Sequence, residues 1–168
     1  GSAADGVHLV RDEIELNAAF KDVTAKFGNR RPIVQEYIDG RQYSIEAIVN
    51  GPIVEVFAIT DRHYDGPYQM IEDGHTVPTH EFDIDNQFKS KQPKAFLIPS
   101  FIDAVKACGL SYGAAKGDLI VDNDGTVYVL EVAARSSGGR FITGTVPLAY
   151  GIRPLRSLTY SKHCALVH

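Results

Sequence analysis

The chain has 168 residues, of which 44% are hydrophobic and 23% are charged. This balance predicts a globular domain with a buried core and excludes a disordered segment. The net charge is -4, with no run of like charges that would mark a nucleic-acid-binding face. Neither a long apolar stretch nor a signal-like N-terminus is present, so we expect a soluble cytoplasmic protein without a membrane span.

The N-terminal region predicts a short strand followed by a helix. A strand is expected over residues 7–10. Asp12 followed by Glu15 matches a capping box, which predicts that a helix begins here, and Gly28 is a suitable end for it. Gly1-Ser2 is typical of a cloning scar, and we therefore expect an excised piece of a longer protein.

The middle of the chain predicts antiparallel strands. Three runs rich in β-branched and aromatic residues lie at 33–38, 43–49 and 53–59. Asn50-Gly51 is a strong hairpin signal between the last two runs. Glycine, proline and polar residues over 61–74 predict a mobile loop, which leads into a strand over 75–82.

The last part of the chain predicts a helix, a second hairpin and a helical tail. The helix is expected over 89–108, the strands at 113–121 and 126–133, and the tail after Gly139. The spacing of Asp122-Asn123-Asp124-Gly125 fits a β-turn better than a calcium loop. The predicted fold class is therefore α+β, with an antiparallel β-sheet flanked by helices.

The second hairpin carries a candidate metal site. If it closes symmetrically, Asp118 lies opposite Val129 and Lys116 lies opposite Glu131, with the charged residues on one face. Two carboxylates at this spacing can bind Mg²⁺ that also contacts phosphate oxygens. The alternative is that Lys116 simply neutralises Glu131 on a solvated sheet face.

A loop of small residues follows this strand. Arg135 offers a planar fork for a phosphate or carboxylate. Ser136, Ser137, Gly138 and Gly139 then allow backbone amides to approach a substrate closely.

Three segments together resemble the later motifs of ATP-grasp enzymes in order and spacing. They lie at 34–46, 116–120 and 131–139, and the resemblance covers about residues 7–151. It implies the C-terminal lobe of an ATP-grasp module, with residues 1–6 as the scar and a truncated flap region, 7–152 as the partial ATP-grasp domain and 153–168 as a C-terminal tail.

The resemblance also implies roles for single residues. The backbone of Glu36 and Ile38 and the side chain of Gln35 would read the adenine edge, and Gln42 stands where the family usually has a glutamate for the ribose.

Asp118 and Glu131 match the two magnesium carboxylates, with Mn²⁺ as an alternative ion. Lys116 matches a basic position beside the developing phosphate charge, and Arg135 matches the arginine that stabilises the acyl phosphate. The residues 136–139 would border the acceptor substrate.

Two departures from the family pattern bear on activity. Ala133 stands where many members carry an asparagine that completes the metal shell. The lysines that contact the α- and β-phosphates would precede Val7, so the isolated piece should be a poor catalyst, completed by an N-terminal domain of the same chain.

Arg62 and His75 are further candidates for contact with ATP phosphates, with a plain surface position as the alternative for each. His63, His75 and His80 match no compact metal-ligand spacing.

The resemblance implies an ATP-dependent carboxylate–amine or carboxylate–thiol ligase that acts through an acyl phosphate, with ATP and Mg²⁺ as cofactors and a small-molecule carboxylate and amine as substrates. Two alternatives stay open. One is an enzyme like carbamoyl-phosphate synthase or biotin carboxylase, and the other is a nucleotide-binding module without catalysis. The sequence does not fix the oligomeric state, and a homodimer is among the assemblies it allows.

Overall fold

The computed structural model describes residues 5–28, 31–65, 71–79 and 97–156. The chain forms two compact units. Unit 1 comprises Gly1–Ile38 and His63–Gly74, and unit 2 comprises Asp39–Arg62 and His75–His168.

In unit 1, helix α1 spans Glu13–Phe27. The Asp12 side chain accepts a hydrogen bond of 2.8 Å from the backbone N–H of Glu15, and Gly28 ends the helix with a φ of 65°. The capping signals therefore predicted both helix ends correctly.

Two predicted strands of unit 1 are absent. Residues 7–10 and 31–39 belong to no strand, so the predictions for 7–10 and 33–38 are wrong. Ile33 and Val34 are 82% and 68% exposed. β-branched residues favour a strand only where a neighbouring strand pairs with the backbone, and no described strand pairs with this segment.

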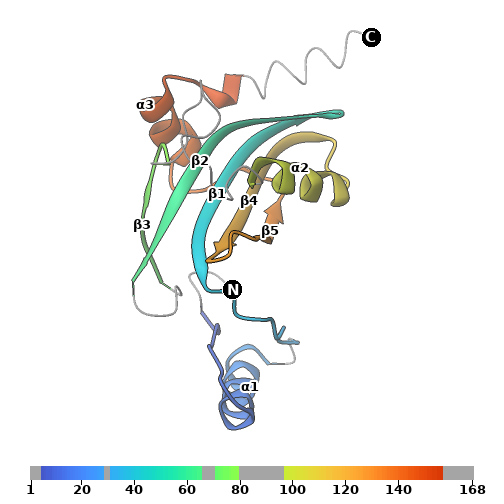
Figure 1. Ribbon diagram of the computed structural model, residues 1–168, viewed down its shortest axis with the longest axis vertical. Helices are drawn as coiled ribbons and strands as arrows, with labels where there is room; N and C mark the ends of the chain where they lie inside the picture. Colours follow the sequence, from blue (N-terminus) through green and yellow to red (C-terminus); the bar gives the residue numbers. More distant parts are fainter. Residues whose placement is uncertain (1–4, 29–30, 66–70, 80–96, 157–168) are drawn as a thin grey trace. The chain divides into compact units, whose positions relative to one another are not determined.

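Within the described residues, five strands form one antiparallel sheet in the order β3-β2-β1-β4-β5 (Figure 1). The strands are β1 (Gly40–Asn50), β2 (Ile53–Asp65), β3 (Ile71–Thr76), β4 (Tyr112–Asp122) and β5 (Val127–Ala133). This confirms the predicted fold class and both predicted hairpins.

The segment predicted as a mobile loop, 61–74, is wrong at both ends. Strand β2 continues to Asp65 and β3 begins at Ile71. The strand predicted over 75–82 therefore begins earlier and ends at Thr76, although residues 80–82 lie outside the described residues. Glycine, proline and polar residues favour a loop, but a strand can also contain polar residues where one of its faces meets water.

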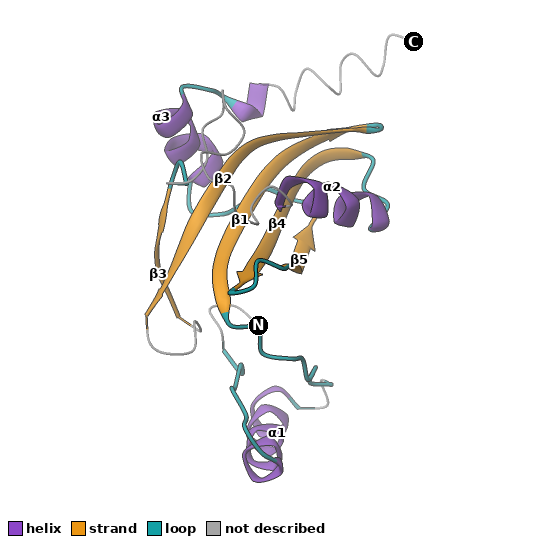
Figure 2. Ribbon diagram, in the orientation of Figure 1, coloured by secondary structure: helices purple, strands orange, loops and turns teal. Residues whose placement is uncertain are grey.

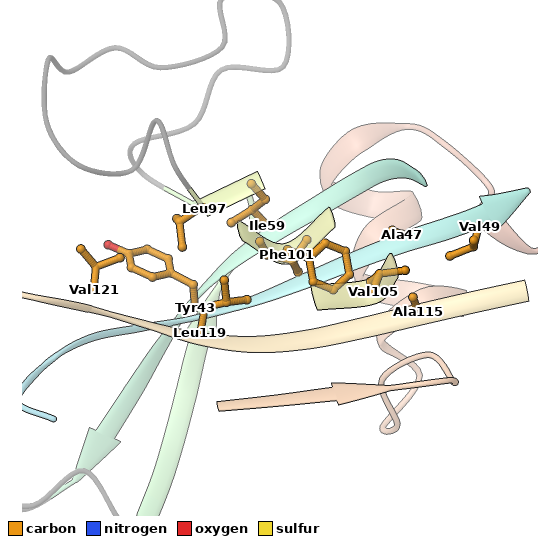
Figure 3. Packing of buried hydrophobic residues seen from close by; sticks show 11 residues of the cluster. Tyr43, Ala47, Val49, Ile59, Leu97, Phe101, Val105, Ala115, Leu119 and Val121 are labelled. Atoms are coloured by element: carbon orange, nitrogen blue, oxygen red, sulfur yellow. The ribbon is translucent and has the colours of Figure 1, made fainter. Parts of the chain in front are cut away.

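Helix α2, Leu97–Ala107, covers one face of the sheet in unit 2. Leu97, Phe101 and Val105 recur every four residues, so they lie on one side of the helix. They pack against buried residues of β1, β2 and β4, including Tyr43 and Leu119 (Figure 3). The part of the predicted helix that is described is confirmed, and residues 89–96 lie outside the described residues.

Alternate residues of the strands point to the opposite face, where the chain after β5 packs. The π-helical turn η2, Phe141–Thr145, leads into α3, Val146–Tyr150 (Figure 2). Phe141, Ile142 and Val146 pack against Ala58 of β2. The helical tail is thus confirmed over 141–150. Among the described residues, no helix has the length and apolar character needed to cross a membrane.

Gly117 lets β4 approach α2 closely, so a larger residue at this position should lower the stability of the fold. A Cβ at Gly117 would lie 2.5 Å from Cδ2 of Phe101, a ring that is fully buried. We expect Gly117→Ala to lower the free energy of unfolding by about 1–3 kcal/mol through overpacking, measured by urea denaturation. Gly74→Ala is the control, because a Cβ there meets nothing within 4 Å. Equal stability of the two variants would contradict the prediction.

Candidate functional site

The face of the sheet opposite α2 carries a row of polar side chains across three strands. Ser44 of β1 lies opposite Asp118 of β4, and Asp118 lies opposite Glu131 of β5. Glu46 lies opposite Lys116 in the next position on this face. Because side chains alternate between faces, the residues between them in β1 and β4 point into the apolar core instead.

The observed register of the second hairpin differs from the predicted one. The turn is one residue longer on one side, with Val121 opposite Val127, and a bulge leaves Leu130 as an extra residue between Val129 and Glu131. Each shift alone would turn β5 to the other face, but two shifts restore the original face. The prediction that Glu131 shares a face with Asp118 is therefore correct, whereas its pairing with Lys116 is wrong.

Asp118 receives hydrogen bonds and ion pairs from three strands. Ser44 Oγ donates to Oδ1 at 2.6 Å. Lys116 Nζ lies 2.6 Å and Arg62 Nη1 3.2 Å from Oδ2. The residue is buried, so these contacts offset the cost of removing a carboxylate from water. Arg62 and Lys116 together carry two positive charges against the single negative charge of Asp118.

Glu131 and Arg135 lie at the solvent-exposed side of the row. Arg135 Nη2 is 3.7 Å from Glu131 Oε1, and both side chains are more than half exposed. Arg135 also donates to the carbonyl oxygen of Ser136 at 3.3 Å. An exposed pair at this distance contributes little to stability, so the guanidinium can exchange this contact for a bound anion at low cost.

Glu46 is a buried carboxylate of this face that the sequence analysis did not include among the site residues. It is fully buried and accepts hydrogen bonds from the backbone N–H of Ser137, at 3.1 Å to Oε1 and 3.4 Å to Oε2. Burial raises the pKa of Glu46 to about 6, although the Ser137 hydrogen bonds and the charge of Lys116 oppose the rise. The sequence signal for this residue is a single acid, Glu46, within the mostly apolar run of β1.

The donor set fits a magnesium ion that shares its shell with phosphate and water. Asp118 and Glu131 provide hard oxygen ligands from directly paired positions, and Mg²⁺ in nucleotide sites usually binds one or two carboxylates. Ala133, opposite Lys116, adds no oxygen. Within the described residues, no group of three or more His, Cys, Asp or Glu side chains could hold a metal by itself.

Three other predicted site residues of unit 2 lie on β1, β2 and β3. Gln42 lies on β1, opposite Ile120 and two positions before Ser44. It therefore belongs to the polar face, which is the face of the sheet opposite α2 that carries Ser44, Glu46, Lys116, Asp118 and Glu131. His75 contacts Phe141 edge to face, with ring centroids 5.4 Å apart. Arg62, predicted to contact phosphate or lie at the surface, binds Asp118 instead of lying isolated at the surface.

The predicted adenine segment belongs to unit 1. Gln35 and Glu36 are exposed and Ile38 is partly buried in an extended stretch without strand pairing. Their predicted contacts with adenine remain predictions. In unit 2, the residues 136–139 form a loop between β5 and η2, in which Gly139 has a φ of 63°. His80 lies outside the described residues.

The chain was compared with known protein families. The ATP-grasp domain family matches residues 1–139. The chain belongs to the ATP-grasp family. The match covers the sheet, whose strands carry the polar side chains, together with α2 and the loop that follows β5. The sequence has no significant match among curated protein sequences.

Solved structures with similar folds include a ligase and two biotin carboxylases. L-amino acid ligase from Bacillus licheniformis is 25% identical, with a TM-score of 0.57 over 86% of this chain and 31% of that chain. Biotin carboxylase from Campylobacter jejuni, solved as a β,γ-ATP complex, is 18% identical, with a TM-score of 0.70 over 94% of this chain and 34% of that chain.

A third similar structure is the biotin carboxylase domain of Hydrogenobacter thermophilus 2-oxoglutarate carboxylase, in complex with MgADP, ADP and bicarbonate. It is 18% identical, with a TM-score of 0.61 over 91% of this chain and 35% of that chain. This chain thus spans about a third of the length of each of the three chains. The two carboxylases, under 25% identical, share the fold with this ATP-grasp chain.

The pKa of Glu46 generates a prediction about pH. An acid whose pKa is raised from 4.5 to about 6 binds more protons in the folded than in the unfolded state. The contribution of Glu46 to the free energy of unfolding is therefore fully present below pH 4.5. It is lost as the pH rises through about 6, a change of about 2 kcal/mol. We expect Glu46→Gln to lack this loss, measured as urea unfolding of both proteins below pH 4.5 and above pH 6.

The exposed Glu55 of β2 supplies the control for this experiment, because Glu55→Gln removes a carboxylate that is solvated in the folded protein. That variant should keep the pH dependence of the wild type. If Glu46→Gln keeps it as well, the buried carboxylate is not its source.

Proposed function

We propose that this chain is the C-terminal part of the ATP-grasp module of a longer enzyme, an ATP-dependent carboxylate–amine ligase. The observation that carries the proposal is the in-register row of Ser44, Asp118 and Glu131, with two cations on Asp118. The family match and the 25% identity to an L-amino acid ligase over 86% of the chain support it. The chain spans 31% of the length of that ligase, and we propose that an N-terminal domain of the same chain completes the enzyme.

The proposed reaction has two steps. An oxygen of the substrate carboxylate takes the γ-phosphoryl group of ATP, which breaks the bond to the β-phosphate oxygen and releases ADP. The amine nitrogen then attacks the acyl carbon, forms the amide, releases phosphate and gives up a proton. A carboxylate–thiol ligation would follow the same course, with sulfur as the nucleophile.

The residues of the polar face divide this work. Asp118 and Glu131 would hold magnesium, which when bound supplies positive charge beside the phosphate oxygens. Lys116 and Arg62 already lie at Asp118 and would provide further positive charge where the phosphoryl group transfers. Arg135, exposed two residues after the end of β5, would stabilise the acyl phosphate and the tetrahedral intermediate. Mn²⁺ would use the same oxygen ligands as Mg²⁺.

One specific observation favours a different function, a nucleotide-binding module without catalysis. Ala133 places a methyl group opposite Lys116, where the resemblance leads us to expect a metal-binding asparagine. A shell that lacks this ligand must be filled by water, or one of the ions is lost. Measured turnover separates the two functions. Release of ADP and phosphate that depends on both substrates supports the ligase, and nucleotide binding without turnover supports the module.

Substitution of Glu131 tests the metal site. We expect Glu131→Gln to weaken magnesium-dependent binding of a non-hydrolysable ATP analogue about tenfold or more, because the lost charge is worth at least about 1.4 kcal/mol there. The side chain is 56% exposed, so stability should change little. Calorimetric titration with and without Mg²⁺, in the full-length protein that contains this chain, measures the effect.

Asp124→Asn, in the exposed turn between β4 and β5, is the matched control and should bind like the wild type. Asp118→Asn is less informative alone, because it leaves Lys116 and Arg62 without their shared carboxylate and should also destabilise the fold. Unchanged magnesium-dependent affinity in Glu131→Gln would remove Glu131 from the metal site.

A further inference from the structure

Glu46 is the fully buried acid of the polar face. It lies in β1 within an unbroken run of buried residues from Tyr43 to Val49. Burying a carboxylate costs several kcal/mol unless charges and hydrogen bonds offset it. The contacts of Glu46 must therefore offset the cost of burying its carboxylate.

The hydrogen-bond partner of Glu46 is the middle of the loop that follows β5. Both carboxylate oxygens lie within 3.4 Å of the backbone nitrogen of Ser137, 91 residues further along the chain. The main-chain N–H of Ser137 is a donor in this contact, so the contact fixes the path of the loop itself. Lys116, opposite Glu46 on β4, provides the nearby positive charge, and Asp118 is the other charged group that acts on Glu46.

The two ends of this loop are held independently. On the N-terminal side, Ala133 is the last residue of β5. On the C-terminal side, Phe141 and Ile142 are buried against Ala58. Between these anchors, the Glu46 contact fixes the loop to the sheet near its centre, two residues beyond Arg135.

We propose that Glu46 is a positioning residue that clamps the loop of residues 136–139 to the sheet, and so orients Arg135 and the loop amides toward the acceptor substrate. The catalytic consequence depends on the proposed ligase function, whereas the clamp itself is a property of the folded chain. A displacement of about 1 Å at such a loop can cost about a hundredfold in rate.

A matched pair of substitutions separates the hydrogen bond from the charge. Glu46→Gln and Glu46→Met both remove the charge and nearly conserve the side-chain volume. Only Gln keeps an oxygen that can accept from Ser137 N–H. A merely space-filling or electrostatic role of Glu46 predicts equal behaviour of the two variants.

Hydrogen exchange of the backbone amides, followed by mass spectrometry, measures the clamp. In Glu46→Met we expect exchange of the peptide covering 134–140 to accelerate about tenfold or more, because a lost hydrogen bond opens the loop. In Glu46→Gln exchange should stay within about threefold of the wild type. Peptides from the centres of β1 and β4 should be unchanged in both variants.

Unchanged exchange of the loop in Glu46→Met would overturn the clamp. Equal acceleration in both variants would do the same, because the accepting oxygen would then be irrelevant. If Glu46→Met does not fold, Ser137→Pro removes the donor in place of the acceptor and should give the same acceleration.

Kinetics in the full-length enzyme test the positioning role. Glu46→Met should lower kcat/KM for the amine about tenfold or more, with KM for ATP within about twofold, and Glu46→Gln should restore most of the loss. Faster loop exchange without this kinetic change would overturn positioning but leave the ligase intact. Absence of ligation in the wild type would refute the proposed function, and the exchange data would still decide the clamp.

Discussion

The carboxylate of Asp118 connects three neighbouring strands on one face of the sheet. Its partners are a hydroxyl from β1, a guanidinium from β2 and an ammonium from β4. Loss of one partner of a buried ion pair costs about 3–5 kcal/mol. The arrangement of the polar face therefore depends on this group keeping its three partners. Oδ2 meets both cations, whereas Oδ1 meets the hydroxyl of Ser44, so Oδ1 is the oxygen that a metal could approach with less electrostatic repulsion.

Local signals in the sequence predicted most of the secondary structure of unit 2. The hairpin dipeptide, the alternation of apolar residues and the spacing within α2 each depend on neighbours in the chain. The prediction failed for 33–38 because strand formation needs a partner that the sequence pattern does not identify. It failed for 61–74 because polar residues are compatible with both a loop and a solvated hairpin.

The candidate site could be predicted in part for the same reason. Lys116 and Asp118 are two residues apart on one strand, so their contact follows from the strand period. The pairing of Asp118 with Glu131 depends on a bulge at Leu130, and no residue type specifies a bulge reliably. The Glu46 contact joins positions 91 residues apart and requires the packing of the C-terminal segment, which only the structure provides.

The position of Ala133 bears on both the proposed metal site and the cations around it. Ala133 lies directly opposite Lys116, and the Cβ atoms of directly opposed residues lie about 5 Å apart. An oxygen at position 133 would compete with Asp118 for the ammonium of Lys116. A methyl group cannot, so the ammonium is left to Asp118, at 2.6 Å. The strand period brings Lys116 to Asp118, and Ala133 supplies no oxygen that would draw the ammonium away. A metal at the site we propose would therefore compete with this lysine for Asp118.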